Sequence, residues 1–267
     1  MILAALALAA AAQVAPPAPV PETEEGRAAA CQATVRRTPQ EALSIANRWQ
    51  ASGGGLLARQ CVGLAYAALE QWTNAATIYE QAAQEAQRAE DSRAADFWVQ
   101  AGNAWLAGGD SARALLAFDT ALGRQSLTPE LRGEVHLDRA RAFVAQNALG
   151  PARDNLNRAL ELVPRDPMAW YLSAALALRQ DDIARARTDI DRARQMAAHD
   201  PDVLLLAGTI AGRAGDMGQA ERLYRQVADR FPDTDAGRTA ATSLQTARDV
   251  EVAPPAAQPT PAPPQPR

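Results

Sequence analysis

Few side chains in this 267-residue sequence could act as general bases, nucleophiles or metal ligands, since it holds only two histidines and two cysteines. Histidine is the side chain whose ordinary pKa lies closest to neutral pH, so His136 and His199 are the candidate general bases. His136 falls in a column that repeats along the chain and is expected to pack against a neighbouring helix, while His199 precedes a proline boundary. The sequence therefore predicts packing roles for both, and predicts neither an enzyme nor a metal or cofactor site.

The charged residues also have a structural explanation. Four arginines between residues 185 and 194 are interleaved with two aspartates on one expected helix. Such a pattern is typical of a solvated helix face, and a docking site for an acidic partner is the alternative. All basic residues of the chain are arginine and the formal net charge is −4. This balance argues against binding of nucleic acid, whose phosphates require a positively charged surface.

Both ends of the chain are expected to lie outside the fold. Residues 1–12 form an uncharged apolar run, which is shorter than the roughly 20 residues of a membrane span and matches the apolar core of a secretory signal peptide. Residues 13–21 and 251–267 are rich in proline, which predicts a linker and a disordered tail. We therefore expect export to the bacterial periplasm with no integral membrane span; a frayed apolar start of a cytosolic protein is the alternative.

An internal repeat organises the residues between these ends. Five alanines each begin the same pattern, with a bulky residue four positions later, a small residue three positions after that, and another small residue twelve positions before the alanine. These are Ala75, Ala114, Ala152, Ala186 and Ala220. Offsets of four and three place the residues on one face of a helix, and the upstream small residue lets a preceding helix approach closely. Each unit is therefore predicted to be an antiparallel helix pair.

Turn-forming residues within the units and prolines at their boundaries fix the expected limits of each pair. The sequence predicts an all-α fold with five pairs, at residues 56–89, 95–128, 133–166, 167–200 and 201–234. A divergent helix pair at residues 22–55 and a capping helix at residues 235–250 are expected to flank them. Such caps are needed because a terminal repeat would otherwise leave its apolar face in water.

These units resemble tetratricopeptide repeats, whose 34-residue pattern combines Trp, Gly, Ala, Phe and Ala at set positions. Residues 95–128 match this pattern best, through Trp98, Gly102, Ala114, Phe118 and Ala121. Two other units depart from it, because Arg59 and His136 stand where the family usually has tryptophan. The resemblance implies a right-handed α-solenoid in which the first helix of each pair lines a concave groove that binds proteins or peptides.

The resemblance also implies which residues face the middle of this groove. They are Val99, Asn103, Leu106, Leu137, Arg141 and Tyr171. Packing of the apolar members against neighbouring helices is the alternative. Family members that clamp a peptide's terminal carboxylate use Lys, Asn and Arg on three successive first helices, and only Asn103 and Arg141 match those positions. An apolar groove, suited to an amphipathic helix or an extended hydrophobic peptide, is therefore favoured.

The two cysteines, Cys31 and Cys61, lie on the expected first helices of consecutive units. Their separation is close to one repeat period, which places neighbouring first helices side by side. In an oxidising periplasm we expect them to form a disulfide, and two buried free thiols are the alternative.

Together these features predict a non-catalytic interaction scaffold of the bacterial cell envelope that binds a protein or peptide partner. The last unit, residues 201–234, resembles repeats of periplasmic envelope-assembly and cell-division coordinating proteins. A self-assembling structural solenoid and an accessory subunit of an envelope enzyme or assembly complex are the alternatives. The oligomeric state does not follow from the sequence.

Overall fold

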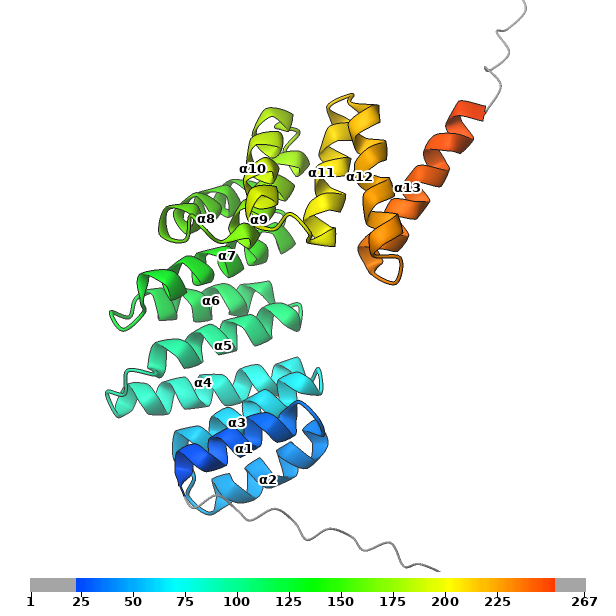
Figure 1. The fold of residues 1–267 in the computed structure, drawn as a ribbon. Coiled ribbons are helices and arrows are strands. Elements are labelled where there is room, and N and C mark those ends of the chain that lie inside the picture. Colours follow the sequence, from blue (N-terminus) through cyan, green and yellow to red (C-terminus); the bar gives the residue numbers. More distant parts are fainter. Residues whose placement is uncertain (1–22, 253–267) are drawn as a thin grey trace, which may run out of the picture. The chain divides into compact units, whose positions relative to one another are not determined.

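The structure, a computed structural model, describes residues 23–252, and over this range it holds thirteen helices and no strand (Figure 1). The all-α fold predicted from the repeat is therefore confirmed. The helices are α1 (Glu24–Val35), α2 (Pro39–Ala51), α3 (Gly55–Ala68), α4 (Trp72–Arg88), α5 (Ala94–Ala107), α6 (Ser111–Leu122), α7 (Pro129–Ala145), α8 (Leu149–Leu162), α9 (Pro167–Arg179), α10 (Ile183–Met196), α11 (Pro201–Arg213), α12 (Met217–Arg230) and α13 (Asp235–Val252). The expected signal peptide, the linker and nearly all of the expected tail lie outside the described residues.

The chain divides into two compact units, and the division falls within α5, between Phe97 and Trp98. In the first unit α1 packs against both α2 and α3, and α3 pairs with α4. The apolar core between the first three helices is built around Leu43, Trp49 and Val62. The indole of Trp49 also donates a hydrogen bond of 3.0 Å to Glu24, which ties the start of α1 to the end of α2.

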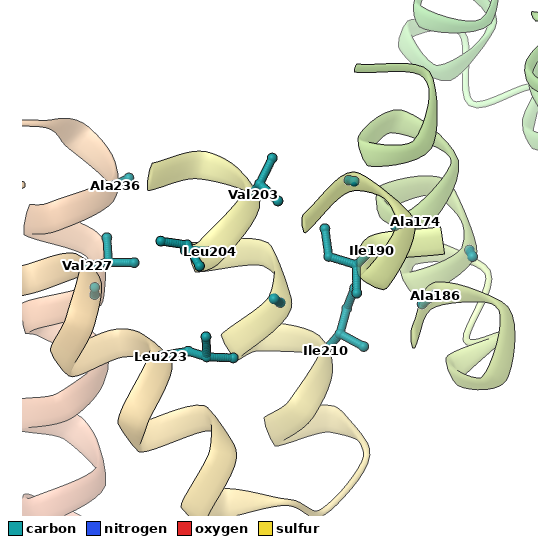
Figure 2. Close-up of a cluster of buried hydrophobic side chains, with 13 residues drawn as sticks. Ala174, Ala186, Ile190, Val203, Leu204, Ile210, Leu223, Val227 and Ala236 are labelled. Carbon is teal, nitrogen blue, oxygen red and sulfur yellow. The ribbon is translucent and has the colours of Figure 1, made fainter. Parts of the chain in front are cut away.

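In the second unit α7 pairs with α8, α9 with α10 and α11 with α12, and α13 packs on α12. Figure 2 shows the apolar cluster at this end of the unit, where Ile190 of α10 meets Ile210 of α11, and Leu204 of α11 faces Val227 of α12. Ala236 of α13 closes the same cluster. The helices from α9 to α13 thus share one apolar core, as expected for a repeat whose units cannot bury their apolar faces alone.

In three of the five repeats the small upstream residue is a glycine, and a bulky side chain covers it. A Cβ atom on Gly63 would lie 2.6 Å from the ring of Tyr79 in the first unit, and one on Gly208 would lie 2.8 Å from the ring of Tyr224 in the second. A Cβ atom on Gly102 would likewise overlap the ring of Phe118. The aromatic ring on the second helix therefore packs directly on the backbone of the first helix. This contact explains why a small residue on the first helix is paired with a bulky residue on the second.

Replacing Ala114 by leucine is expected to destabilise the protein by about 1–3 kcal/mol through overpacking. Ala114 is fully buried on α6, in the alanine column common to all five units. The free energy of unfolding from urea titration measures the effect. Leu116→Ala serves as the control, because Leu116 lies on the same helix and is 68% exposed. An unchanged unfolding midpoint for Ala114→Leu would remove the register from which the groove residues were assigned.

Candidate peptide-binding site

The six residues expected in the groove lie on three first helices of the second unit and differ in exposure. Val99, Asn103 and Leu106 are on α5, Leu137 and Arg141 on α7, and Tyr171 on α9. Val99 and Leu137 are only 7% and 6% exposed, so they belong to the core, as the packing alternative proposed. Leu106 and Tyr171 are half-buried, and Asn103 and Arg141 are exposed. Of the six residues, these four therefore keep solvent-accessible surface.

Asn103 and Arg141 are joined through a third residue, Asp138. Arg141 Nη1 donates to Asp138 Oδ1 at 3.0 Å, and the Asn103 side chain bonds to the same carboxylate from the neighbouring first helix. The Asp138 side chain is 17% exposed, and burial raises the pKa of Asp138 against the opposing effect of Arg141. A partner's terminal carboxylate would meet this negative charge in place of a free arginine. The cluster therefore disfavours a carboxylate clamp.

The sequence interpretation did not identify Asp138. The signal was available as an acidic residue three positions before Arg141 on the same helix, a spacing at which side chains meet. What the spacing could not reveal is the contact with Asn103, because that residue comes from a different helix pair.

A hollow of about 120 Å³ lies beside Tyr171, where α9 and α11 begin. It is lined by Pro167, Met168, Tyr171, Ala197, Asp200, Asp202 and Val203. Burial raises the pKa of Tyr171, and the nearby carboxylates of Asp202 and Asp200 raise it further. The hollow thus combines apolar walls with a negatively charged rim.

At the other end of the first helices, arginines bind the turn of the preceding pair. Arg179 Nη2 donates to Asn147 Oδ1 at 2.7 Å, and Arg213 Nη2 lies 2.6 Å from Asp181 Oδ1. Asn147 and Asp181 occupy the same turn position, with φ of 58° and 60°, a conformation that Asn and Asp tolerate better than most residues. These arginines therefore join successive pairs, Arg179 through hydrogen bonds to neutral groups and Arg213 through an exposed ion pair.

Known proteins share features of sequence and fold with this chain. Residues 202–234 match the tetratricopeptide repeat family. The fold is that of tetratricopeptide repeat proteins. PilW, a widely conserved type IV pilus biogenesis factor, superposes with a TM-score of 0.70 at 20% identity, covering 83% of this chain and 99% of PilW. PilF of Pseudomonas aeruginosa superposes with a TM-score of 0.65 at 16% identity, covering 82% and 97%. YrrB, a TPR protein with an unusual peptide-binding site, gives 0.51 at 17%, covering 73% and 96%.

These identities show a common fold and nothing finer, and no curated protein sequence matches the chain significantly. Tetratricopeptide repeats generally serve as scaffolds for protein–protein interaction, with the function set by the surface of each protein. Over residues 23–252, each helix is too short or too polar to cross a lipid bilayer.

The tetratricopeptide pairs of the second unit also enclose a polar network that the sequence interpretation missed. Ser173 on α9 is fully buried and donates to Asp189 Oδ2 on α10 at 2.6 Å. Arg153 of α8 donates to the Ser173 hydroxyl at 2.6 Å, and Arg185 Nε donates to Asp189 Oδ2 at 3.3 Å. The expectation of a solvated face is therefore wrong for Asp189, which is 5% exposed. The Ser173 hydroxyl is buried away from solvent. The network connects α8, α9 and α10.

His136 makes a similar contact in its own repeat. Its Nδ1 lies 2.9 Å from Asn155 Oδ1 on α8, and the Asn155 amide nitrogen donates to the Pro151 carbonyl. The oxygen of Asn155 is thus the acceptor, and His136 Nδ1 carries the proton. Burial lowers the pKa of His136, so the ring is neutral at pH 7. Among residues 23–252 no three His, Cys, Asp or Glu side chains are grouped to hold a metal ion.

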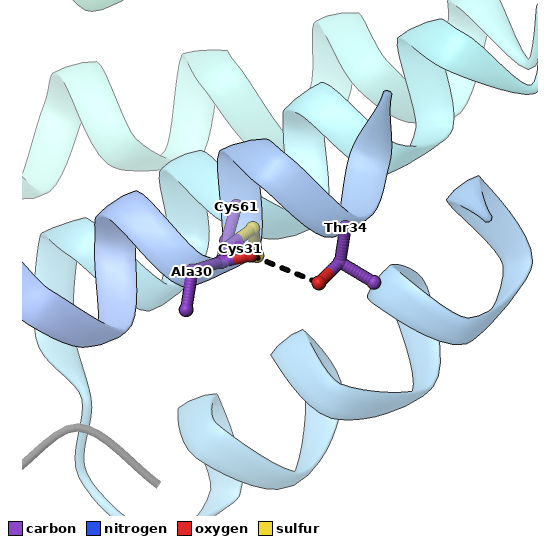
Figure 3. The surroundings of a disulfide bond; sticks show 4 residues. All are labelled: Ala30, Cys31, Thr34 and Cys61. Atoms are coloured by element: carbon purple, nitrogen blue, oxygen red, sulfur yellow. Dashed lines mark hydrogen bonds between the residues drawn. A yellow bond between two sulfur atoms is a disulfide. The ribbon is translucent and has the colours of Figure 1, made fainter. Parts of the chain in front are cut away.

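In the first unit the repeat pairs are linked covalently. A disulfide joins Cys31 of α1 to Cys61 of α3, with the Cα atoms 6.0 Å apart (Figure 3). Both cysteines are buried, at 4% and 2% exposure. One turn further along α1, Thr34 donates to the Ala30 carbonyl at 2.9 Å, so its hydroxyl stays on its own helix. The bond therefore connects the first helices of two consecutive pairs.

Proposed function

We propose that this tetratricopeptide repeat protein is a non-catalytic scaffold that binds a peptide or a partner helix on the exposed side of α5, α7 and α9. The observation that carries the proposal is that Leu106 of α5 and Tyr171 of α9 remain partly exposed on two first helices of the second unit. Asn103 of α5 and Arg141 of α7 are exposed and offer polar contacts on the same set of first helices. A groove of this composition suits an amphipathic segment.

We further propose that the protein acts in the bacterial cell envelope, on the periplasmic side. The apolar run at residues 1–12 supports export. The disulfide between Cys31 and Cys61 supports an oxidising compartment, because cytosolic thiols are usually kept reduced. The similarity in fold to PilW, a type IV pilus biogenesis factor, agrees with such a location.

Replacing Leu106 or Tyr171 by alanine is expected to weaken peptide binding about thirtyfold, or by about 2 kcal/mol, because a few central apolar contacts carry most of the affinity at such surfaces. A peptide ligand is first selected from a displayed random library on the full chain, and its Kd is then measured by fluorescence anisotropy for each variant. Circular dichroism checks that each variant is folded.

The matched control is Arg192→Ala, an exposed position on the second helix α10. We choose Arg192 rather than Arg185, because Arg185 bonds to Asp189 and to Asn157 and its removal would disturb the helix packing. Arg192→Ala should leave the Kd unchanged within error. Loss of binding in Arg192→Ala, with Leu106→Ala unaffected, would place the binding surface on the second helices and contradict the proposal.

A further inference from the structure

The hollow between α9 and α11 has the walls of a site for one apolar side chain. Its apolar lining includes the half-buried Tyr171 together with Pro167, Ala197 and Val203. Met168 also lines it and is 52% exposed. Methionine is flexible and polarisable, so it can adapt to side chains of different shape. The volume of about 120 Å³ suits a single side chain rather than a helix.

The rim of the hollow is negatively charged. Asp200 caps α11 by accepting from the backbone N–H groups of Asp202 and Val203, at 2.9 and 3.1 Å. Neither Asp200 nor Asp202 forms an ion pair with an arginine in the part of the chain that the structure describes. Both carboxylates act on the Tyr171 phenol, whose pKa they raise, so their field reaches into the hollow.

We propose that this hollow binds an apolar side chain that is followed directly by an arginine or lysine in a partner polypeptide. The apolar side chain would enter between Tyr171 and Val203, and the cation would lie against Asp202. Charge complementarity carries the choice, because the rim offers two carboxylates and no cation lines the hollow. The inference rests on the proposed function and adds the chemistry of the partner at one point of the surface.

The experiment uses the full chain labelled with ¹³C at the methionine methyl groups. The sequence holds four methionines, so few signals appear and each can be assigned by substitution. Met168 reports on the hollow, and Met217 on α12, which is 66% exposed, reports on non-specific contact. The ligands are acetyl-Gly-Leu-Arg-Gly-amide, the same peptide with Glu in place of Arg, and the same peptide with Ser in place of Leu.

We expect the Met168 methyl signal to shift with the Leu-Arg peptide and Met217 to stay in place. The Kd from the Met168 shift should be about fivefold lower for the Leu-Arg peptide than for the Leu-Glu peptide, the size of effect that a partly exposed charge pair supports. Asp202→Asn should remove this difference, because it removes a carboxylate charge from the rim. The variant should keep its fold, since the cap of α11 is made by Asp200. Asp191→Asn, an exposed position on α10, should preserve the difference.

Equal affinity for the Leu-Arg and Leu-Glu peptides would overturn the inference, as would a Met168 signal that no peptide moves. A shift of Met168 on deletion of residues 253–267, with no response to the peptides, would assign the hollow to the chain's own tail and also overturn it. The proposed function is tested separately by the selected peptide. If that peptide needs Leu106 and binds Asp202→Asn as tightly as the unaltered chain, the scaffold function stands and only this inference fails.

Discussion

Reduction of the disulfide between Cys31 and Cys61 is expected to lower the free energy of unfolding of the first unit by at most about 3.6 kcal/mol. The bond closes a loop with a sequence separation of 30 residues, and loop-closure entropy in the unfolded chain sets this upper figure. The effect falls on a unit whose core is small and rich in alanine, so it should be readily measured. Urea unfolding with and without a thiol reductant gives the difference.

The control for the reductant is the double variant Cys31→Ala with Cys61→Ala, whose unfolding midpoint should not respond to reducing conditions. Labelling of the unreduced, unfolded protein with a thiol reagent provides an independent measurement, and no reactive thiol should be found. Two labelled thiols in protein prepared from the periplasm would show that the bond is absent there. That result would also remove the support that the disulfide gives to an oxidising location.

The helix pairs could be predicted from sequence because the small residue and the bulky residue that contact one another both belong to the same repeat. Gly102 and Phe118 lie sixteen residues apart in one unit, and Gly208 and Tyr224 repeat that spacing in another. A ring packed on a glycine backbone tolerates neither a larger residue on one side nor a small one on the other. Paired small and bulky positions of this kind therefore determine which two helices pack together, and they do so from the sequence of a single repeat.

Exposure on the first helices could be predicted less well. The resemblance to the repeat family predicts Val99 and Leu106 in the same groove, yet Val99 is 7% exposed and Leu106 is half-buried. Spacing gives the direction of a side chain from its own helix, whereas burial depends on how closely the next pair approaches. That distance is set by residues of another unit, which one-helix periodicity does not contain.

The polar network around Ser173 likewise depends on contacts between helices that the spacing along one helix does not predict. An alternation of Arg and Asp along α10 is typical of a solvated face, and Asp191 with Arg194 follows this rule. Asp189 does not, because Ser173 of α9 and Arg153 of α8 reach it from the preceding helices. The one sequence signal was a serine within the apolar run of α9, since a buried hydroxyl must find a hydrogen-bond partner.

Asp189→Ala should destabilise the protein by about 2–4 kcal/mol, because it removes the carboxylate that Ser173 and Arg185 share. Burial and the charge of Arg185 lower the pKa of Arg153, and Asp189 opposes this effect. Without this carboxylate, the repulsion between Arg153 and Arg185 is compensated less, with the charge of Asp182 still acting on Arg153. The figure lies below that of a fully buried ion pair, because the Arg185 side chain is 36% exposed and water can compensate part of the loss.

Asp191→Ala provides the matched comparison, since Asp191 lies two residues further along α10 and its side chain is 60% exposed beside Arg194. Its removal should change the free energy of unfolding by no more than about 0.5 kcal/mol. Asp189→Asn should fall between the two, because the amide oxygen can still accept from Ser173 while the charge is lost. Equal urea midpoints for Asp189→Ala and Asp191→Ala would mean that the network is solvated in solution, and that apolar packing alone holds α8, α9 and α10 together.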